Sequence, residues 1–415
     1  MSSPERAGDG AGVRFLDDVR VLEIASLAPT QLGMHLADLG AEVIKIEPPR
    51  RGDATRLIAK QPGFDDSGLH RRWNRGKRSV AIDTSTAEGV SLLRRLVPRV
   101  DILIEGLRPG TLERIGLGWS ELTALRPDLV MASLSGYGQS GPYRDMPSHG
   151  IAFDAISGLA AVEEDDGRPR VATRHVYYGS LLAPLFGATA TLAALSWSRR
   201  TGRSVLLDVA QADAASFANI GIEDVAAARG AAVAGTAEIP RPAPPHADGE
   251  ARSTTQAYRT RDGRLLMLMA LERKFFVRLA EAIGRSDLVG RVPEDQYIVQ
   301  GDKEIDDAVA AAIASEDLLH WMRVFADADV PVVPINRTET AVDDPQLASR
   351  ITWLPAAQGT VTMKSPVRSD PCIVAPDPSP AVGQDTAAVL SELGIGAAEI
   401  ERLAAAGVVR LARED

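Results

Sequence analysis

The sequence predicts an α/β protein with a large domain built on a mostly parallel sheet, followed by a smaller α+β domain. Its 415 residues exceed what one core usually spans, because single domains commonly hold roughly 100–200 residues. From Val19 onward, short apolar runs alternate with helical patterns, which is typical of a parallel sheet covered on both faces. Alanine, glycine and proline then dominate residues 229–250, which we interpret as a linker. We expect a frayed tail over 1–12, the large domain over 13–228 and the small domain over 251–340.

Five apolar runs predict the strands of the large domain, at residues 19–24, 43–46, 79–82, 101–105 and 129–133. Helices are expected over 31–39, where Gly40 ends the pattern, and over 119–125. A further helix follows the capping-box pattern of Ser85 and Glu88 and stops near Pro98. The alternation of these strands and helices along the chain supports the prediction of a parallel sheet.

The small domain begins with a predicted hairpin, in which Asp262-Gly263 turns between strands at 257–260 and 265–269. Helices over 274–284 and 305–314 and a strand at 332–333 complete it. Beyond it, residues 371–380 are proline-rich, and a final helix is expected over 386–393 before Gly394.

Composition narrows the class of protein. The formal net charge is −10, which disfavours a generic nucleic-acid surface. A single cysteine, Cys372, excludes an internal disulfide and a cysteine-cluster zinc site, and the six histidines lack ligand spacing, so we expect no metal. The start of the chain lacks a secretory pattern, and the arginine- and alanine-rich composition suggests a bacterium with a GC-rich genome. We expect a cytoplasmic protein.

One apolar stretch, residues 181–197, approaches the length of a membrane span. It contains Pro184, Gly187 and two threonines and ends at Arg199-Arg200. We interpret it as a buried core helix and expect no membrane contact.

Several familiar catalytic signatures do not occur, namely GxxxxGKS/T, GxSxG, HExxH and CxxC. The first strand leads into Ser26-Leu27-Ala28-Pro29-Thr30 rather than GxGxxG, so a nicotinamide site is not supported. Arginines instead follow the strands, at positions 56, 75, 78, 108 and 114. They suit a phosphate-bearing ligand at the carboxyl edge of the sheet, and the alternative is a set of solvated surface charges.

Short motifs recur along nearly the whole chain: ADLGAEVIKIE (37–47), GDATR (52–56), NRGKRS (74–79), EGLRPG (105–110), SGYGQSGP (135–142), TGR (201–203), DG (262–263) and GQDT (383–386). Together these motifs resemble the class III CoA-transferase family, which includes formyl-CoA transferase, carnitine CoA-transferase and α-methylacyl-CoA racemase.

The resemblance implies a Rossmann-like CoA-binding domain, a small domain, a return segment over 341–415 that packs on the large domain, and two subunits interlocked as a homodimer. It places CoA contacts at Arg56, Arg78, Arg108 and Arg114, with Leu27 and Ala28 lining the path of the pantetheine arm. Gly106 departs from the pattern, because many relatives carry asparagine there.

The catalytic position departs too. Transferases of this family use an aspartate that attacks the thioester and forms a mixed anhydride, and counting back from Leu195 places Ser180 there. The sequence has no carboxylate between Asp166 and Asp208, so the anhydride route is not expected. Ser180 is interpreted as the N-cap of the following helix, with a nucleophilic role as the alternative.

His149 is the candidate base, because its segment resembles one in the racemases and imidazole titrates near neutrality. A histidine bonded to a loop backbone is the alternative. Glu272 resembles a racemase glutamate that faces the site from the small domain. Asp154 is a weaker substitute for the missing carboxylate, and the acidic run at 163–166 is interpreted as a solvated loop.

We therefore expect an acyl-CoA-processing transferase that passes the acyl group from CoA to a small acceptor (an acid, a thiol or hydrosulfide, or water) without the aspartyl anhydride. One rival hypothesis is an acyl-CoA epimerase that uses His149 as its base. The other is a non-catalytic CoA-binding partner subunit.

Overall fold

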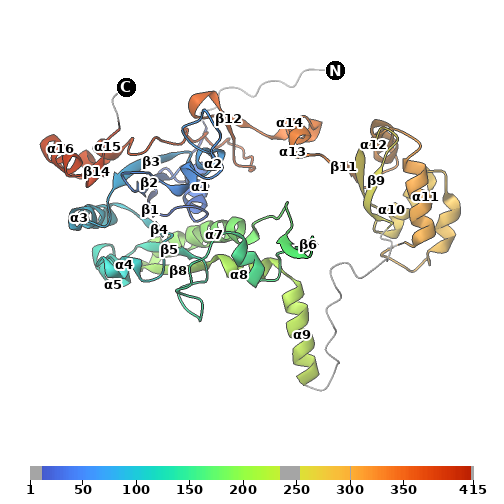
Figure 1. Ribbon diagram of the computed structural model, residues 1–415, viewed down its shortest axis with the longest axis horizontal. Helices are drawn as coiled ribbons and strands as arrows, with labels where there is room; N and C mark the ends of the chain where they lie inside the picture. The colour runs from blue at the N-terminus through green and yellow to red at the C-terminus, as the bar shows by residue number, and fades with distance from the viewer. Residues whose placement is uncertain (1–11, 234–252, 300, 413–415) are drawn as a thin grey trace. The chain divides into compact units, whose positions relative to one another are not determined.

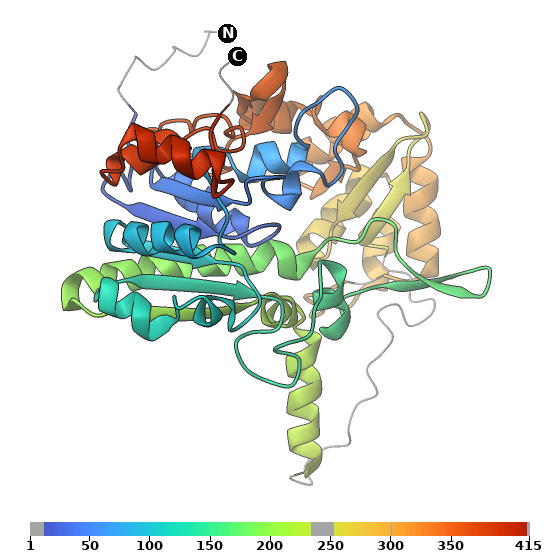
Figure 2. The same ribbon diagram turned by 60° about the vertical axis from the view of Figure 1, so that its left-hand side comes forward.

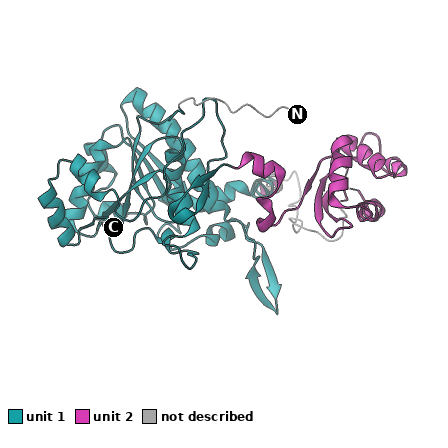
Figure 3. Cartoon of the chain, turned by 90° about the horizontal axis from the view of Figure 1, so that it is seen from above, with its two compact units in different colours: residues 1–227, 352–415 teal, residues 228–351 magenta. Residues whose placement is uncertain are grey.

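The computed structural model describes residues 12–233, 253–299 and 301–412, which form two compact units. Unit 1 contains residues 1–227 and 352–415, and unit 2 contains residues 228–351 (Figure 3). The expected tail and most of the expected linker lie outside the described residues. At the linker's expected start the chain is instead helical, because α9 (Gly221–Val233) runs into it. The second unit also extends past residue 340 to Ile351, and Asn336 donates a hydrogen bond to Asp344 across that boundary at 3.0 Å.

The sheet of unit 1 has seven strands in the order β14-β3-β2-β1-β4-β5-β8, and every pairing except β14 with β3 is parallel (Figure 1). This confirms the predicted parallel sheet and adds two strands that the sequence reading missed. The strands are β1 (Arg20–Ile24), β2 (Glu42–Glu47), β3 (Lys77–Ile82), β4 (Ile102–Glu105), β5 (Val130–Ser135), β8 (Val205–Ala210) and β14 (Val409–Arg410). Because the chain leaves the neighbours β1 and β4 in opposite directions, a crevice is expected at their carboxyl ends.

Helices cover both faces of the sheet (Figures 1 and 2). One face carries α1 (Thr30–Asp38) and α7 (Tyr178–Thr201), and the other carries α3 (Ala87–Leu96), α5 (Trp119–Leu125), α15 (Thr386–Glu392) and α16 (Ala397–Ala405). Shorter elements connect them: α2 (Gly68–Trp73), α4 (Thr111–Arg114), α6 (Ile151–Ile156), α8 (Gln211–Ala218), the hairpin β6 (Val162–Asp165) and β7 (Arg168–Val171), and the pair β12 (Trp353–Pro355) and β13 (Val361–Met363).

Two predicted details of these helices were wrong. Thr86, not Ser85, caps α3 by accepting a hydrogen bond from the amide of Gly89, because the Ser85 hydroxyl is bonded to Asp83. The helix α15 is not the final element, since α16 and β14 follow it.

Of the helices in the described residues, only α7 is long and apolar enough to cross a membrane. On one side of α7, Ala183, Ala188 and Leu195 are buried against the rest of unit 1. On another side of the helix, Leu181 and Leu185 are 46% and 49% exposed. The expected core helix is thus buried over part of its surface only, and it leaves an apolar stripe uncovered.

Unit 2 is an antiparallel sheet with helices packed on it. Its strand order is β11-β10-β9, and β9 (Thr255–Arg259) pairs with β10 (Leu265–Met269) as the predicted hairpin. The other elements are α10 (Arg273–Ala282), α11 (Lys303–Ile313), α12 (Leu318–Asp327), β11 (Val332–Pro334), α13 (Thr338–Ala341) and α14 (Pro345–Arg350). Phe276, Trp321 and Phe325 are buried in its core.

Candidate active site

A crevice lies at the carboxyl ends of β1 to β4, where the strand order predicts it. Ser26 lines it beyond β1, and Gly106 and Leu107 line it beyond β4. Leu27 adopts a left-handed backbone conformation, with φ 61°, as the chain turns into α1. The Ser26 hydroxyl donates to Asp53 Oδ1 at 2.8 Å, which fixes this turn.

Gly106 is explained by this packing. A Cβ atom at that position would lie 2.7 Å from Cβ of Pro29, closer than such atoms approach in proteins. A side chain there, such as the asparagine that the family resemblance predicts, therefore has no space beside Pro29.

A buried ionic network lies beside the crevice and explains several of the motif residues. Lys45 on β2 and Lys77 on β3 both bond Glu23 on β1, at 2.9 and 2.8 Å, and all three side chains are buried. Both lysines also donate to Thr30, the first residue of α1. Burial alone would lower the pKa of Lys45, but the surrounding carboxylates, Glu23 first, raise it. This network joins the three strands to the start of α1.

Arg56 belongs to the same buried region. Its guanidinium donates to Glu47 at 2.8 and 3.0 Å, to both oxygens of Asp66 at 3.0 and 3.1 Å, and to the Pro380 carbonyl at 3.0 Å. These acceptors account for all five N–H donors of an arginine. We therefore assign Arg56 a structural role and leave it out of the proposed CoA contacts.

Arg78 lies at the other edge of the sheet, near the amino end of β3. It forms ion pairs with Glu42 and Glu392, the latter at 2.6 Å. Two carboxylates thus occupy its guanidinium, and we leave it out of the proposed CoA contacts as well. The expectation that all the arginines follow strands does not hold for it, because Arg78 is the second residue of β3.

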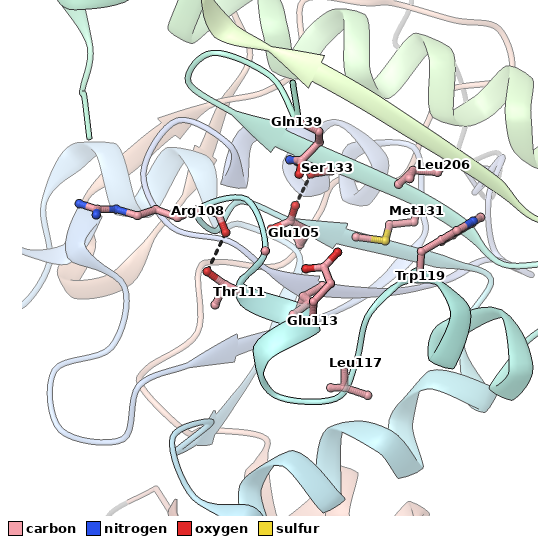
Figure 4. A pocket seen from close by; sticks show the side chains of 12 residues that line it. Glu105, Arg108, Thr111, Glu113, Leu117, Trp119, Met131, Ser133, Gln139 and Leu206 are labelled. Atoms are coloured by element: carbon pink, nitrogen blue, oxygen red, sulfur yellow. Dashed lines mark hydrogen bonds between the residues drawn. The ribbon is translucent and has the colours of Figure 1, made fainter. Parts of the chain in front are cut away.

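Arg108 and Arg114 fit the phosphate role better. Both are exposed and follow β4, and Arg114 donates to the Thr111 hydroxyl at 2.7 Å. The Arg108 side chain points away from the carboxyl groups of Glu105 and Glu113 (Figure 4). In the described part of the chain, neither guanidinium has a carboxylate partner.

Glu105 is the buried acid of the hollow beside these arginines (Figure 4). Its carboxyl accepts hydrogen bonds from the Ser133 hydroxyl and from the amide of Leu107, the latter at 2.8 Å. Burial raises the pKa of Glu105 to about 7 despite these bonds. Gln139 completes the group by donating to the Ser133 hydroxyl at 2.7 Å.

A second hollow along the same edge carries three arginines that the sequence reading did not select. Arg50, Arg51 and Arg410 line it, and it shares Pro48 and Asp83 with the crevice. Little in the sequence indicates this arginine cluster, because Arg410 lies more than three hundred residues after Arg50 and Arg51. Arg410 is brought to this edge of the sheet only by the pairing of β14 with β3.

Ser180 lies in the first turn of α7, but it is not the N-cap. Tyr177 occupies that position, and the Ser180 hydroxyl donates to Oε1 of Gln211 at 3.0 Å. Its carbonyl accepts a hydrogen bond from Gln31 at 2.9 Å. The N-cap interpretation was therefore wrong, and the residue instead connects the starts of α7 and α8.

Asp154 reaches the same helix start. One carboxylate oxygen accepts a hydrogen bond from the amide of Gly179 at 2.8 Å, and the other is bonded to Nε2 of His175 at 2.8 Å. Sequence reasoning gave His175 no role, because nothing in the sequence indicates that two residues 21 positions apart pair.

Two candidates remain, His149 and Glu272. His149 is exposed in the loop before α6, and only its backbone forms a described hydrogen bond, from the amide of Ala152. Glu272 belongs to unit 2, where it precedes α10. Among the residues that the structure describes, no group of three or more potential ligands could hold a metal ion.

Residues 16–386 match the sequence model of CoA-transferase family III. The chain belongs to this family. A succinyl-CoA–D-citramalate CoA-transferase of Chloroflexus aurantiacus is 35% identical over 350 residues, which cover 81% of this chain and 82% of the relative. The probable fatty acyl-CoA transferase Rv3272 of Mycobacterium tuberculosis is 30% identical over 395 residues, covering 91% and 97%.

Solved structures of CoA-transferase family III relatives agree with the fold. A mutant of Rv3272 superposes with a TM-score of 0.75 at 26% identity and covers 92% of this chain and 99% of its own. A CaiB/BaiF family protein from Brucella suis gives a TM-score of 0.71 at 26% identity, covering 90% and 98%. The resemblance drawn from the motifs is confirmed, and the chain is a CoA-transferase-like enzyme of CoA-transferase family III, whose members use CoA thioesters.

Proposed function

We propose that the enzyme moves an acyl group from a CoA thioester to a small acceptor without an aspartyl anhydride. The observation that carries this proposal is the start of α7, where residue 180 is a serine whose hydroxyl is bonded to Gln211. Asp154, which also touches this helix start, is fully buried with both oxygens engaged. A direct attack of the acceptor on the thioester needs no protein carboxylate at position 180.

In this proposal CoA lies along the carboxyl edge of the sheet. The pantetheine arm passes Leu27 and Ala28 in the crevice, and exposed Arg108 and Arg114 bind phosphate groups. Arg50, Arg51 and Arg410 add positive charge farther along this edge. Charge-assisted bonds of this kind are stronger than neutral hydrogen bonds.

The acceptor proposed first is a small organic acid. Several relatives are named for dicarboxylates or hydroxy acids, among them L-malate, glutarate and D-citramalate. Hydrosulfide, other thiols and water remain as further acceptors from the sequence reasoning.

The decisive experiment incubates the protein with acetyl-CoA, succinyl-CoA and longer acyl-CoAs, each with L-malate, glutarate, hydrosulfide or buffer alone. Mass spectrometry then follows free CoA and the acylated acceptor, or the new CoA thioester. Formation of either product supports the proposal. Deuterium uptake at the α-carbon without CoA release would support the rival epimerase, in which His149 is the base.

A second candidate function follows from two relatives that are named the alpha and beta subunits of one succinyl-CoA–L-malate CoA-transferase. This chain could likewise be a CoA-binding partner subunit. Tight CoA binding with no turnover on any acyl-CoA would favour that function.

A further inference from the structure

The side chain of Asp154 is a buried carboxylate that the motifs do not explain. Asp154 is 0% exposed, and a buried carboxylate is costly unless it is fully hydrogen-bonded. Its two partners come from one short segment: the amide of Gly179 in the first turn of α7, and the ring of His175 just before that helix. The helix start stabilises the negative charge, because unpaired amides and the helix dipole point toward it.

The contact requires glycine at position 179. A Cβ atom there would lie 2.5 Å from the carbonyl oxygen of Gln211. The same residue thus lets α7 approach α8 closely and donates its amide to Asp154. Asp154 is in this way bonded to the residue next to Ser180, and His175 is bonded to Asp154.

The carboxylate also fixes the hydrogen of the imidazole. A carboxylate in its ionised form only accepts hydrogen bonds, so with that form of Asp154 the bonded Nε2 of His175 carries the hydrogen, and Nδ1 of a neutral ring keeps its lone pair. In the described residues, Nδ1 has no hydrogen-bond partner. The ring packs edge-on to Tyr177 and Tyr178, with centroids 5.7 and 6.3 Å away, and both tyrosines are partly exposed.

We propose that His175 is the catalytic base of the acyl transfer and that Asp154 is its positioning residue. This inference rests on the function proposed above. Nδ1 takes the proton of an O–H or S–H group of the bound acceptor (the hydroxyl of a hydroxy acid, a thiol, hydrosulfide or water) as that oxygen or sulfur attacks the thioester carbonyl. A carboxylate group of the acceptor carries no such proton and is not the attacking group in this step. The bond between the acceptor and the acyl carbon forms, the C–S bond breaks, and His175 returns the proton to the sulfur of CoA. No electron is gained or lost, and the ring ends in its starting form.

His175→Gln and His175→Ala test the base, with His320→Gln in unit 2 as the matched control. Turnover of the best acyl-CoA and acceptor pair should fall about 10²–10⁴-fold in both His175 variants, the usual contribution of a general base. The affinity for CoA, measured by calorimetry, should change less than about twofold. Added imidazole should restore part of the activity of His175→Ala, which a purely structural role would not allow. Wild-type turnover in His175→Gln would overturn the inference.

Asp154→Asn tests the positioning role. The amide keeps the size of the side chain but no longer dictates which ring nitrogen is protonated, so kcat should fall at least about tenfold while KM for the acyl-CoA stays within twofold. Nitrogen-15 NMR of the His175 ring should show the changed tautomer. An unchanged kcat together with an unchanged tautomer would remove Asp154 from the assignment.

A measurement on the wild-type protein applies even where a variant does not fold. Adding S-ethyl-CoA with the acceptor should shift the Nδ1 resonance of His175, because the acceptor hydrogen-bonds to it. No shift at saturating ligand would contradict the inference. If the wild-type protein turns over no acyl-CoA at all, the proposed function fails first, and that result is separate from the outcome for His175.

Discussion

The Ser180 hydroxyl and the Gln211 side chain meet at 3.0 Å where α7 and α8 begin. The family resemblance predicts the attacking aspartate of the transferases at the position that Ser180 occupies. An aspartate there could take the same bond if the Gln211 amide turned its NH2 group toward it, since an amide offers both an acceptor and donors.

Ser180→Asp should therefore create CoA transfer through an anhydride. After turnover with an isotope-labelled acceptor, the label should be detectable in the new carboxylate at position 180. Ser180→Ala is its control, and it should lose only about 1 kcal/mol of stability with little loss of turnover, because one hydrogen bond disappears. An acyl adduct on Ser180 in the wild-type protein would contradict this prediction and make serine the nucleophile.

Arg56→Ala should reduce stability rather than CoA affinity. Removing one partner of a buried ion pair typically costs about 3–5 kcal/mol, because Glu47 is left charged and buried. Burial alone would raise the pKa of Glu47, but Arg56 holds it at about 2.

The pKa of Glu47 determines how the stability that its ion pair with Arg56 contributes changes with pH. The folded pKa of Glu47 lies below its unfolded value of about 4.3, so the pair stabilises fully above that pH and less as pH falls toward 2. Urea unfolding should show that Arg56→Ala has a lower free energy of unfolding than the wild type at pH 7, and that this difference is smaller at pH 3. Arg170→Ala, at an exposed pair with Asp165, should cost less than about 1 kcal/mol.

The stability contribution of Glu105 should depend on pH in the opposite direction to that of Glu47, and Glu105→Gln tests this. The folded pKa of Glu105 is raised to about 7 by burial, so its contribution to stability is complete below about pH 4.3 and is lost as pH rises through 7. A glutamine stays neutral, so this variant should resist urea better than the wild type at pH 8 and equally at pH 4. Exposed Glu113, in the same hollow, is the matched control as Glu113→Gln. Equal effects of both changes would show that burial is not the cause.

The double variant Arg108→Ala with Arg114→Ala should weaken CoA binding at least about tenfold in calorimetry, because each charge-assisted bond to a phosphate contributes about 1.5–3 kcal/mol. Arg199→Ala with Arg200→Ala removes the same charge at the end of α7 and should leave the affinity unchanged. Unchanged binding in the first variant would move the phosphate site elsewhere, and Arg50 and Arg51 would be tested next.

An interlocked homodimer is the final prediction. Leu185, Phe186, Phe217 and Ile220 are 42–72% exposed, and such apolar side chains near one another commonly mark an interface. Sedimentation should show a dimer at nanomolar concentration, since separating interlocked chains requires unfolding. Leu185→Glu with Phe186→Glu should yield aggregated or unfolded protein, whereas Leu319→Glu in unit 2 should behave as wild type. A folded monomer on dilution would exclude interlocking.

Much of the fold could be predicted from local patterns. Apolar runs marked five strands of the large sheet, and Asp262-Gly263 marked the hairpin of unit 2. The strand β14 escaped notice because two residues carry no periodicity.

The site was harder to predict, because its chemistry depends on pairings across the fold. Arginines within the motifs indicate a ligand site, yet Arg56 and Arg78 are neutralised by carboxylates from other elements. His175 showed the reverse, since no motif pointed to it, and Asp154 was predicted only as a weak substitute for the missing carboxylate. Sequence spacing cannot distinguish a free guanidinium from one that is already paired.

Unit 1 is assembled from two separate stretches of chain, and this imposes an order on biosynthesis. A ribosome completes β1 to β8 and all of unit 2 before it makes residues 352–415. Until then β3 has an open edge, Arg56 lacks the Pro380 carbonyl, and the hydroxyl of Thr386 is not yet present to accept the amide of Ala81. Unit 1 therefore remains incomplete, with the edge of β3 and these hydrogen-bonding groups without partners, while unit 2 is synthesised. We expect chaperones to bind most strongly to nascent chains that are stalled before residue 380.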